Sequence, residues 1–178
     1  MKPWKTLSRK TILNHSKWLK IEDHIIQLPD GKTIEQWPWI ISPDYVNVVV
    51  QDADENFICF RQTKYAANGL TLAPVGGYLE PNEDPLECAK RELREELGCE
   101  ALEWIPLGRF PCDGNHGNGF ANLFLARGAY RVGEINTDDL EEQEIVTLTR
   151  NEMMQALLSG DFKVLSWTTA IALALFHV

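Results

Sequence analysis

The chain has 178 residues, of which 44% are hydrophobic and 24% charged, and its net charge is −9. This size and composition fit one globular domain with a substantial core, and the negative charge disfavours DNA or RNA as a partner. Four Cys residues show no C-x-x-C spacing, which favours reduced thiols and a cytoplasmic location. The N-terminus lacks the apolar core of a signal peptide, and the longest apolar stretch, residues 170–176, is too short to cross a membrane.

The N-terminal residues 1–44 are expected to form a β-hairpin that extends a domain at 45–178. Two β-prone runs flank Pro29-Asp30-Gly31, and Asp-Gly between such runs is a strong hairpin signal. The runs are residues 18–28 and 32–41. Because side chains alternate along a strand, Trp37 and Trp39 should share one face, where they serve core packing, dimer packing or ligand binding.

The core sheet is expected to begin with strands at 45–51 and 56–61, joined by the turn at 52–55. Residues 77–99 follow as a glycine turn and a helix. Asp84 should cap this helix with Pro85 at its first position, where the missing N–H has no cost. The helix should bury an apolar stripe of Leu86, Ala89, Leu93 and Leu97. Later elements are expected as strands at 102–110, 120–126 and 144–148 and helices at 150–158 and 165–176.

Three carboxylates crowd the C-terminal end of the expected helix: Glu92, Glu95 and Glu96. Like charges at this spacing repel by roughly 0.2–0.5 kcal/mol per pair, and the helix dipole adds to the cost. A divalent cation reverses the sign, because Mg²⁺ takes oxygen ligands and leaves positions for water and substrate phosphates. A solvated acidic face is the alternative interpretation.

The spacing resembles the Nudix box, Gly-x5-Glu-x7-Arg-Glu-U-x-Glu-Glu-x-Gly-U, where U is apolar. The fixed positions hold Gly77, Glu83, Arg91, Glu92, Leu93, Glu95, Glu96 and Gly98. Cys99 stands at the final apolar position and can pack as a small hydrophobe. The resemblance covers about residues 45–160 and implies an α/β/α sandwich with a mixed sheet, extended here by the N-terminal hairpin. It also implies a metal-dependent hydrolase.

Within this resemblance, a Mg²⁺ or Mn²⁺ ion is expected on the Gly76 carbonyl and on Glu92, Glu95 and Glu96. Glu95 and Glu96 are also predicted to be catalytic residues, because the ion that they hold would activate a water for attack on phosphorus. The remaining box residues are expected to orient the loop and helix. These structural residues are Gly77, which with Gly76 lets the backbone turn tightly, and the ion pair of Glu83 and Arg91.

An acidic residue from a later loop supplies a base or a further ligand in relatives that hydrolyse nucleoside diphosphate sugars. The acidic run at 138–144 lies at about the right distance after the box. Glu141 and Glu142 are the leading candidates, with Glu144 behind them. For each of the three taken singly, a solvated loop acid is the default explanation.

Substrate contacts are suggested by three further segments. Arg61 and Lys64 lie in a stretch that resembles one near the substrate of ADP-ribose pyrophosphatases, although surface charge is the default explanation. The same resemblance places an aromatic residue from the N-terminal region, Trp37 or Trp39, against the adenine. His116, in the glycine-rich loop 113–119, is a candidate to contact the sugar, with a flexible turn as the alternative.

The leading hypothesis is hydrolysis of a nucleoside diphosphate sugar, with ADP-ribose split into AMP and ribose 5-phosphate. The resemblance also predicts a homodimer formed through the N-terminal hairpin, with packing of the hairpin on its own domain as the alternative. A housecleaning hydrolase of other nucleotides and a catalytically silent nucleotide-sugar sensor are the alternatives. ADP-ribose pyrophosphatases usually carry a proline in the loop that follows the box, whereas Pro111 stands early here, so the reaction is better defined than the substrate.

Overall fold

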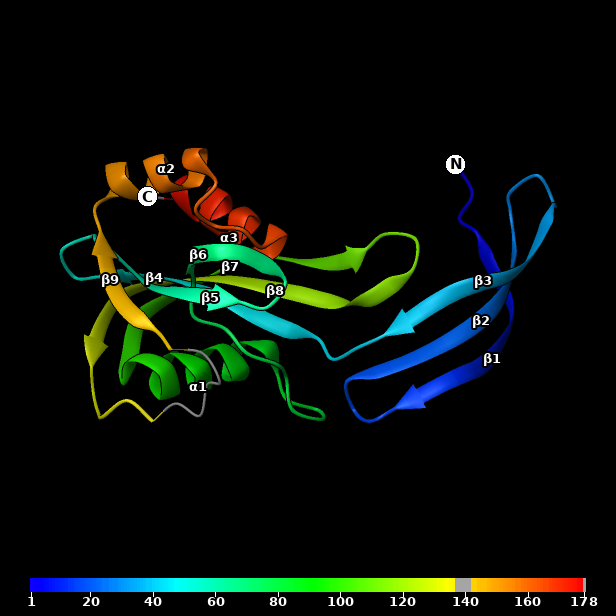
Figure 1. Ribbon diagram of the computed structural model, residues 1–178, viewed down its shortest axis with the longest axis horizontal. Coiled ribbons are helices and arrows are strands. Elements are labelled where there is room, and N and C mark those ends of the chain that lie inside the picture. The colour runs from blue at the N-terminus through cyan, green and yellow to red at the C-terminus, as the bar shows by residue number, and fades with distance from the viewer. Residues whose placement is uncertain (137–141, 178) are drawn as a thin grey trace. The chain divides into compact units, whose positions relative to one another are not determined.

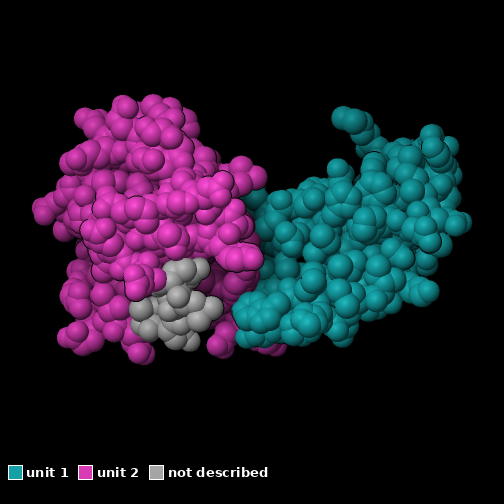
Figure 2. All heavy atoms as spheres, in the orientation of Figure 1, with its two compact units in different colours: residues 1–44, 110–120 teal, residues 45–109, 121–178 magenta. Residues whose placement is uncertain are grey.

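The computed structural model describes residues 1–136 and 142–177 (Figure 1). It divides into two compact units, coloured separately in Figure 2. The N-terminal unit consists of residues 1–44 and 110–120, and the larger unit holds the other described residues. Among the residues described, no helix is long and apolar enough to cross a membrane.

The larger unit is built on a mixed sheet. Strand β4 (Tyr45–Asp52) pairs in parallel with β8 (Gly117–Arg131) and antiparallel with β5 (Phe57–Lys64). The other strands pair at the sides of these: β7 (Cys99–Asp113) with β8, and β6 (Ala67–Ala73) and β9 (Glu144–Leu148) with β5. The expected pairing of the first two core strands is therefore confirmed, whereas β6 was not expected.

Helices cover both faces of this sheet (Figure 1). Helix α1 (Pro85–Leu97) lies on one face, and α2 (Arg150–Ser159) and α3 (Leu165–Leu175) lie on the other. The core between these layers includes the buried run Val46–Val50 of β4, together with Leu93 from α1 and Ile171 from α3. The expected sandwich of a mixed sheet between helices is confirmed. The four Cys side chains are free thiols, and Cys99 is buried as a small apolar side chain.

The N-terminal unit is an antiparallel sheet of three strands, in the order β1, β2, β3. Strands β2 (Leu19–Gln27) and β3 (Thr33–Ile41) form the expected hairpin. Strand β1 (Lys5–His15) was not expected. All eleven of its residues are exposed, so its sequence carries no alternation between buried and exposed positions.

The hairpin tip between β7 and β8 belongs to the N-terminal unit and is fastened to β3. The Ile40 amide donates to the His116 carbonyl at 2.8 Å, and Trp37 Nε1 donates to the Asn115 carbonyl at 2.9 Å. The glycine-rich segment expected as a loop is thus a short turn held by backbone hydrogen bonds.

Candidate functional site

The carboxylate-bearing helix has both of its ends fixed by local chemistry. Asp84 Oδ1 accepts the amides of Leu86 and Glu87 at 2.9 and 3.3 Å, with Pro85 in the first turn. Gly98 closes the helix in the left-handed region at φ 63°, where a side chain would also meet the Gly133 carbonyl. The predicted helix start at Asp84 and Pro85 is confirmed.

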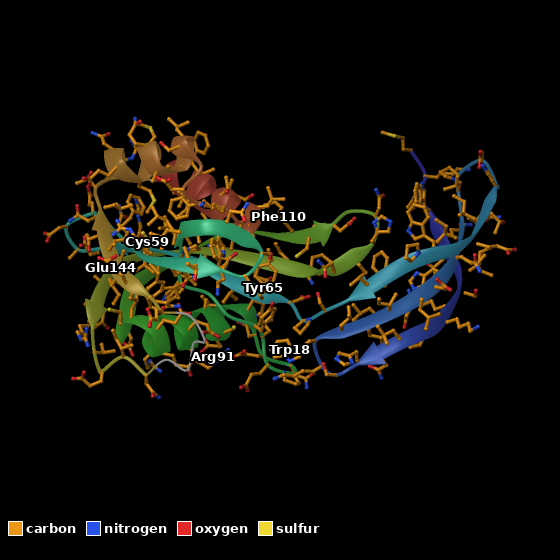
Figure 3. All side chains as sticks on the ribbon, viewed as in Figure 1. Trp18, Cys59, Tyr65, Arg91, Phe110 and Glu144 are labelled. Carbon is orange, nitrogen blue, oxygen red and sulfur yellow. The ribbon has the colours of Figure 1, made fainter. Side chains whose placement is uncertain are left out.

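Arg91 gathers the acidic side chains around it, and Figure 3 shows it on α1. Its Nε and Nη2 bind the two oxygens of Glu83 at 2.9 and 3.0 Å, a bidentate pair. Its Nη1 donates to Glu92 at 2.7 Å and to Glu95 at 3.1 Å. The Arg91 hydrogen bonds lower the pKa of Glu83 to about 2. The positive charge of Arg91 therefore offsets the repulsion that the spacing of these carboxylates predicts.

The Gly76-Gly77 pair is needed for close approach, and it lies in an extended segment whose flanking residues, Val75 and Tyr78, each bridge to β4. A Cβ on Gly77 would lie 2.0 Å from a carboxylate oxygen of Glu92. A Cβ on Gly76 would lie 2.5 Å from the Val46 carbonyl. The sequence-based interpretation explained this pair by a tight turn. The structure explains it by lack of space, because the backbone here runs directly over the Glu92 side chain and beside β4.

Glu96 is buried and faces the same glycine segment. The Gly76 amide donates to Glu96 Oε2 at 3.3 Å, whereas the carbonyls of Val75 and Gly77 accept from β4. Successive peptide groups of an extended segment point to opposite sides, so the Gly76 carbonyl faces away from β4, toward the side where Glu96 lies. A backbone oxygen and a carboxylate are thereby presented on one side.

A small pocket of about 40 Å³ adjoins Glu96 and is rich in oxygen atoms. Its lining includes Asn47, Gln62, Lys64, Gly76, Glu96 and Gln143. The buried oxygens Asn47 Oδ1 and Gln62 Oε1 have no hydrogen-bond partner in the part of the chain that the structure describes. Buried amide oxygens without partners are costly, so they mark a place suited to a water, a cation or a substrate hydroxyl.

A divalent cation fits these donors by their chemistry. The carboxylates of α1, the Gly76 carbonyl and the orphaned amide oxygens are all hard oxygen ligands, which Mg²⁺ and Mn²⁺ prefer. Across residues 1–136 and 142–177, no three acidic, His or Cys side chains are already clustered as a metal site. Glu92 and Glu95 are instead turned toward Arg91, and Glu96 toward the Gly76 amide.

The candidate bases occupy different surroundings. Glu142 is exposed, and its neighbour Gln143 lines the pocket beside Glu96. Glu144 begins β9 (Figure 3). It pairs with Arg61 at 2.9 Å in an exposed contact. Glu141 lies outside the described residues. Of the two candidates that the structure describes, Glu142 is therefore next in sequence to a pocket-lining residue, whereas Glu144 is paired with Arg61.

The two cationic candidates of β5, Arg61 and Lys64, lie on opposite faces of the strand, because successive side chains alternate. Lys64 lines the pocket that contains Glu96, together with Gln62. Arg61 is exposed, is not among the pocket-lining residues and pairs with Glu144. The structure thus places Lys64 with the acidic box residues and leaves Arg61 in a cross-strand ion pair.

The aromatic candidates meet within the N-terminal unit. The Trp37 ring stacks on His116, with centroids 5.2 Å apart and planes inclined by 10°. Trp39 stacks on His24 at 5.5 Å. Asp113 accepts the amides of Asn115 and His116, and its carboxylate lies 3.1 Å from His116 Nδ1. Trp37 and Trp39 therefore line one pocket, and His116 lies against the Trp37 ring.

Sequence reasoning missed several polar side chains that the fold buries. Asn47 and Gln62 are single amides within buried strand segments, and Glu22 and His24 are buried in β2. An isolated polar residue at a position where alternation predicts burial is the signal that could have identified them. Such residues require a hydrogen-bonding reason to be there.

Two family models together match nearly the whole chain. The model described as NUDIX domain matches residues 42–168. The model described as nucleoside diphosphate sugar hydrolase N-terminal domain matches residues 4–40. The second match corresponds closely to the three strands of the N-terminal unit.

Characterised relatives match most of the chain at low identity. A CMP-5'-(N-acetyl-N-hydroxy-3-aminopropyl)phosphonate hydrolase of Streptomyces rubellomurinus is 26% identical over 91% of this chain and 77% of its own. A methanol dehydrogenase activator of Bacillus methanolicus is 27% identical over 86% of this chain and 80% of its own. A crystal structure of an ADP compounds hydrolase superposes with a TM-score of 0.81, covering 98% of this chain and 93% of that one, at 21% identity. This structural likeness shows a shared fold.

Proposed function

The chain belongs to the Nudix family, and on that premise we propose that it hydrolyses the pyrophosphate bond of a nucleoside diphosphate sugar. Nudix membership makes it a pyrophosphohydrolase. The N-terminal match to nucleoside diphosphate sugar hydrolases supports the substrate class. ADP-ribose is the leading substrate, giving AMP and ribose 5-phosphate. Two similar proteins are named for CMP and ADP compounds, and both of those nucleotides carry an amino-bearing base.

The observation that carries this proposal is the oxygen-rich arrangement around the glycine pair. Gly76 contacts Glu96, Gly77 lies against Glu92, and Arg91 joins Glu92 to Glu95. Members of the family generally use divalent metal ions, and we assign Mg²⁺ or Mn²⁺ here to Gly76, Glu92, Glu95 and Glu96. When bound, such an ion neutralises charge on the pyrophosphate oxygens and lowers the pKa of a bound water.

The chain's own residues do the rest of the work in this mechanism. Arg91 pairs with Glu83, Glu92 and Glu95, so it fixes the helix to its leading loop and keeps Glu92 against Gly77. Lys64, in the pocket with Glu96, balances the charge of a phosphate group. A carboxylate from the acidic segment takes the proton of the attacking water. The first candidates are Glu141 and Glu142, and Glu144 is the third. The nucleoside or sugar is contacted by Trp37, Trp39 and His116. Arg61 is a further candidate to contact the substrate.

A homodimer formed through the N-terminal unit is the second part of the proposal. This unit exposes apolar side chains that a partner could cover: Trp4, Leu7, Ile12, Leu13, Trp18 and Ile41. A small sheet gains stability when such side chains are covered. Light scattering at micromolar concentration should give twice the chain mass, and a monomer would contradict the dimer.

A product screen tests the function. Nucleoside diphosphate sugars, dinucleotides and nucleoside triphosphates are each incubated with the protein and Mg²⁺, and the products are identified by chromatography. We expect a nucleoside monophosphate and a sugar phosphate from the first class, fastest with ADP-ribose. Preferential hydrolysis of triphosphates or dinucleotides would favour the housecleaning alternative, and binding without hydrolysis would favour the sensor.

A further inference from the structure

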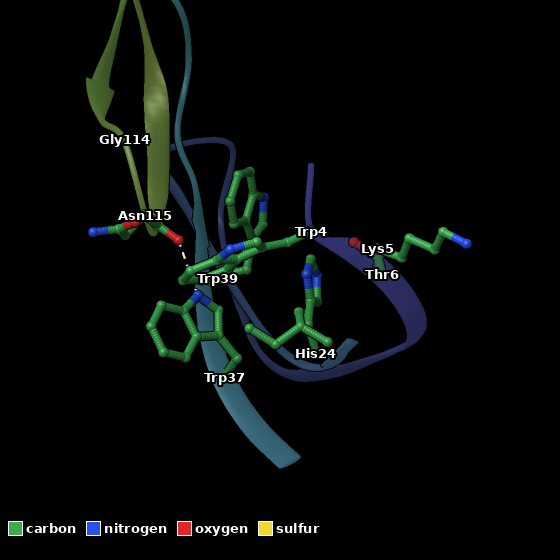
Figure 4. Close-up of a pocket in the computed structure, with 9 residues that line it drawn as sticks. Trp4, Lys5, Thr6, His24, Trp37, Trp39, Gly114 and Asn115 are labelled. Carbon is green, nitrogen blue, oxygen red and sulfur yellow. Dashed lines mark hydrogen bonds between the residues drawn. The ribbon is translucent and has the colours of Figure 1, made fainter. Parts of the chain in front are cut away.

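The N-terminal unit contains a pocket of its own, of about 350 Å³ (Figure 4). Its lining includes Trp4, Thr6, His24, Trp37, Trp39 and Asn115. The volume lies within the roughly 300–1,000 Å³ that is typical of small-molecule sites. Indole surfaces with a few polar groups suit a planar ring that stacks and hydrogen-bonds through its edge.

His24 is the buried polar side chain of this pocket. It is only 4% exposed, and it lies opposite Trp37 in the β2–β3 pairing, while Glu22 lies opposite Trp39. Cross-strand partners in an antiparallel sheet project to the same face, so β2 and β3 together present His24 among the indoles. Its ring stacks on Trp39 at 5.5 Å with the planes inclined by 16°.

Glu22 determines which nitrogen of His24 carries the proton. Glu22 Oε1 binds Lys20 Nζ at 2.5 Å, and Oε2 lies 3.0 Å from His24 Nε2. The hydrogen bonds from Lys20 and His24 lower the pKa of Glu22, so its carboxylate is ionised and can only accept. The proton of neutral His24 therefore sits on Nε2, and Nδ1 presents a lone pair. Among the described residues, Nδ1 has no hydrogen-bond partner.

We propose that His24 is a specificity-determining residue whose Nδ1 accepts a hydrogen bond from the exocyclic amino group of a nucleobase in this pocket. Glu22 is the positioning residue that fixes the tautomer. The pocket then selects adenine or cytosine, which carry an amino group at C6 or C4 respectively, over hypoxanthine, guanine or uracil, which place a carbonyl oxygen at that position. This inference rests on the proposed function for its ligand class and adds the chemical rule by which the base is chosen.

The size of the preference follows from the cost of an unmade hydrogen bond. A carbonyl oxygen opposite the Nδ1 lone pair leaves two acceptors facing each other at the buried His24 ring. Sites that hydrogen-bond a ligand group reject analogues without it more strongly than apolar pockets reject a change of shape. We expect a preference of at least roughly tenfold for the amino base.

The test uses the full chain and ligands that contain no bond to hydrolyse. Quenching of tryptophan fluorescence is titrated with AMP and with IMP, and separately with CMP and UMP, at pH 8.5 without metal. The wild type should bind AMP and CMP at least roughly tenfold more tightly than IMP and UMP. Equal affinities within each pair in the wild type would overturn the proposal.

Two variants separate His24 chemistry from packing. His24→Phe keeps a ring against Trp39 but removes the acceptor, and Glu22→Gln keeps His24 but frees its tautomer. Both should reduce the preference to threefold or less, and the Glu22→Gln variant should do so by improving IMP binding as well as by weakening AMP binding. His15→Phe, at an exposed histidine of β1 outside the pocket, is the matched control and should retain the wild-type preference.

The outcomes distinguish this inference from the proposed function. Full preference in both variants would assign the selection to another group and overturn the role of His24. Selective binding without hydrolysis of ADP-ribose would uphold the inference and contradict the enzymatic proposal. Hydrolysis with no base preference would do the reverse.

Discussion

The acidic helix and the N-terminal unit are stabilised in different ways. Around Arg91, the carboxylates of Glu83, Glu92 and Glu95 are joined by short-range hydrogen bonds within one helix and its leading loop. The N-terminal unit depends instead on partners far away in sequence, as in the 2.9 Å bond from Trp37 to Asn115. Local networks leave a fixed spacing in the sequence, whereas long-range contacts leave only scattered aromatic and polar residues. We infer that the first region performs the reaction and the second selects the substrate.

The largest effect should come from Glu96→Gln in the acidic helix. This change removes a charge beside Gly76 but keeps the side-chain shape, so the fold should persist. Loss of a metal-positioned electrostatic interaction should raise the barrier by about 3 kcal/mol or more, which lowers kcat at least a hundredfold. Steady-state kinetics with Mg²⁺ provide the measurement. Wild-type kcat in this variant would refute the metal assignment, and unchanged AMP binding would show that the N-terminal pocket is independent of it.

A second large effect should identify the base. Glu141→Gln and Glu142→Gln are compared, and the change at the true base should reduce kcat by at least roughly a hundredfold. Glu144→Gln, at the third candidate, should have a smaller effect, because Glu144 is exposed and paired with Arg61. If neither Glu141 nor Glu142 affects kcat, the base lies elsewhere, and a large loss at Glu144 would move the assignment there.

The N-terminal unit should respond in KM rather than kcat. Trp37→Ala removes the ring that stacks on His116, and we expect KM for ADP-ribose to rise about tenfold with kcat within threefold of wild type, since base stacking contributes roughly 1–3 kcal/mol. Trp37→Phe retains stacking and should raise KM less. A selective fall in kcat would break the proposed division between the two regions.

The smallest effect concerns stability and pH. The pKa of Glu83 is lowered to about 2 from its usual value of about 4.5, so its pairing with Arg91 stabilises the fold fully above that usual value. That stability is lost as pH falls through 4.5 toward 2. Arg91→Gln should lower the free energy of unfolding by about 2 kcal/mol at pH 7, and the difference from wild type should shrink on acidification. Urea unfolding between pH 7 and pH 3 checks this, and a difference that grows toward pH 3 would contradict it.

The difference between the acidic helix and the N-terminal unit also explains which features the sequence could predict. The start of α1 at Asp84 and Pro85, and the group around Arg91, depend on neighbours within one turn of helix or one loop, so residue spacing was enough. Strand β1 was missed because all of its side chains are exposed. His24 was missed because its ring stacks on Trp39 of the neighbouring strand β3, a relation that residue spacing alone cannot show.

The most direct test of the account is a phosphorus NMR time course of ADP-ribose with the full chain and Mg²⁺. We predict that the two pyrophosphate resonances disappear together and that the phosphomonoester resonances of AMP and ribose 5-phosphate appear in equal amounts. Omission of Mg²⁺ and the Glu96→Gln variant should each leave ADP-ribose intact. Pyrophosphate resonances that persist with the wild type and Mg²⁺ would contradict the central claim that this chain cleaves a nucleoside diphosphate sugar.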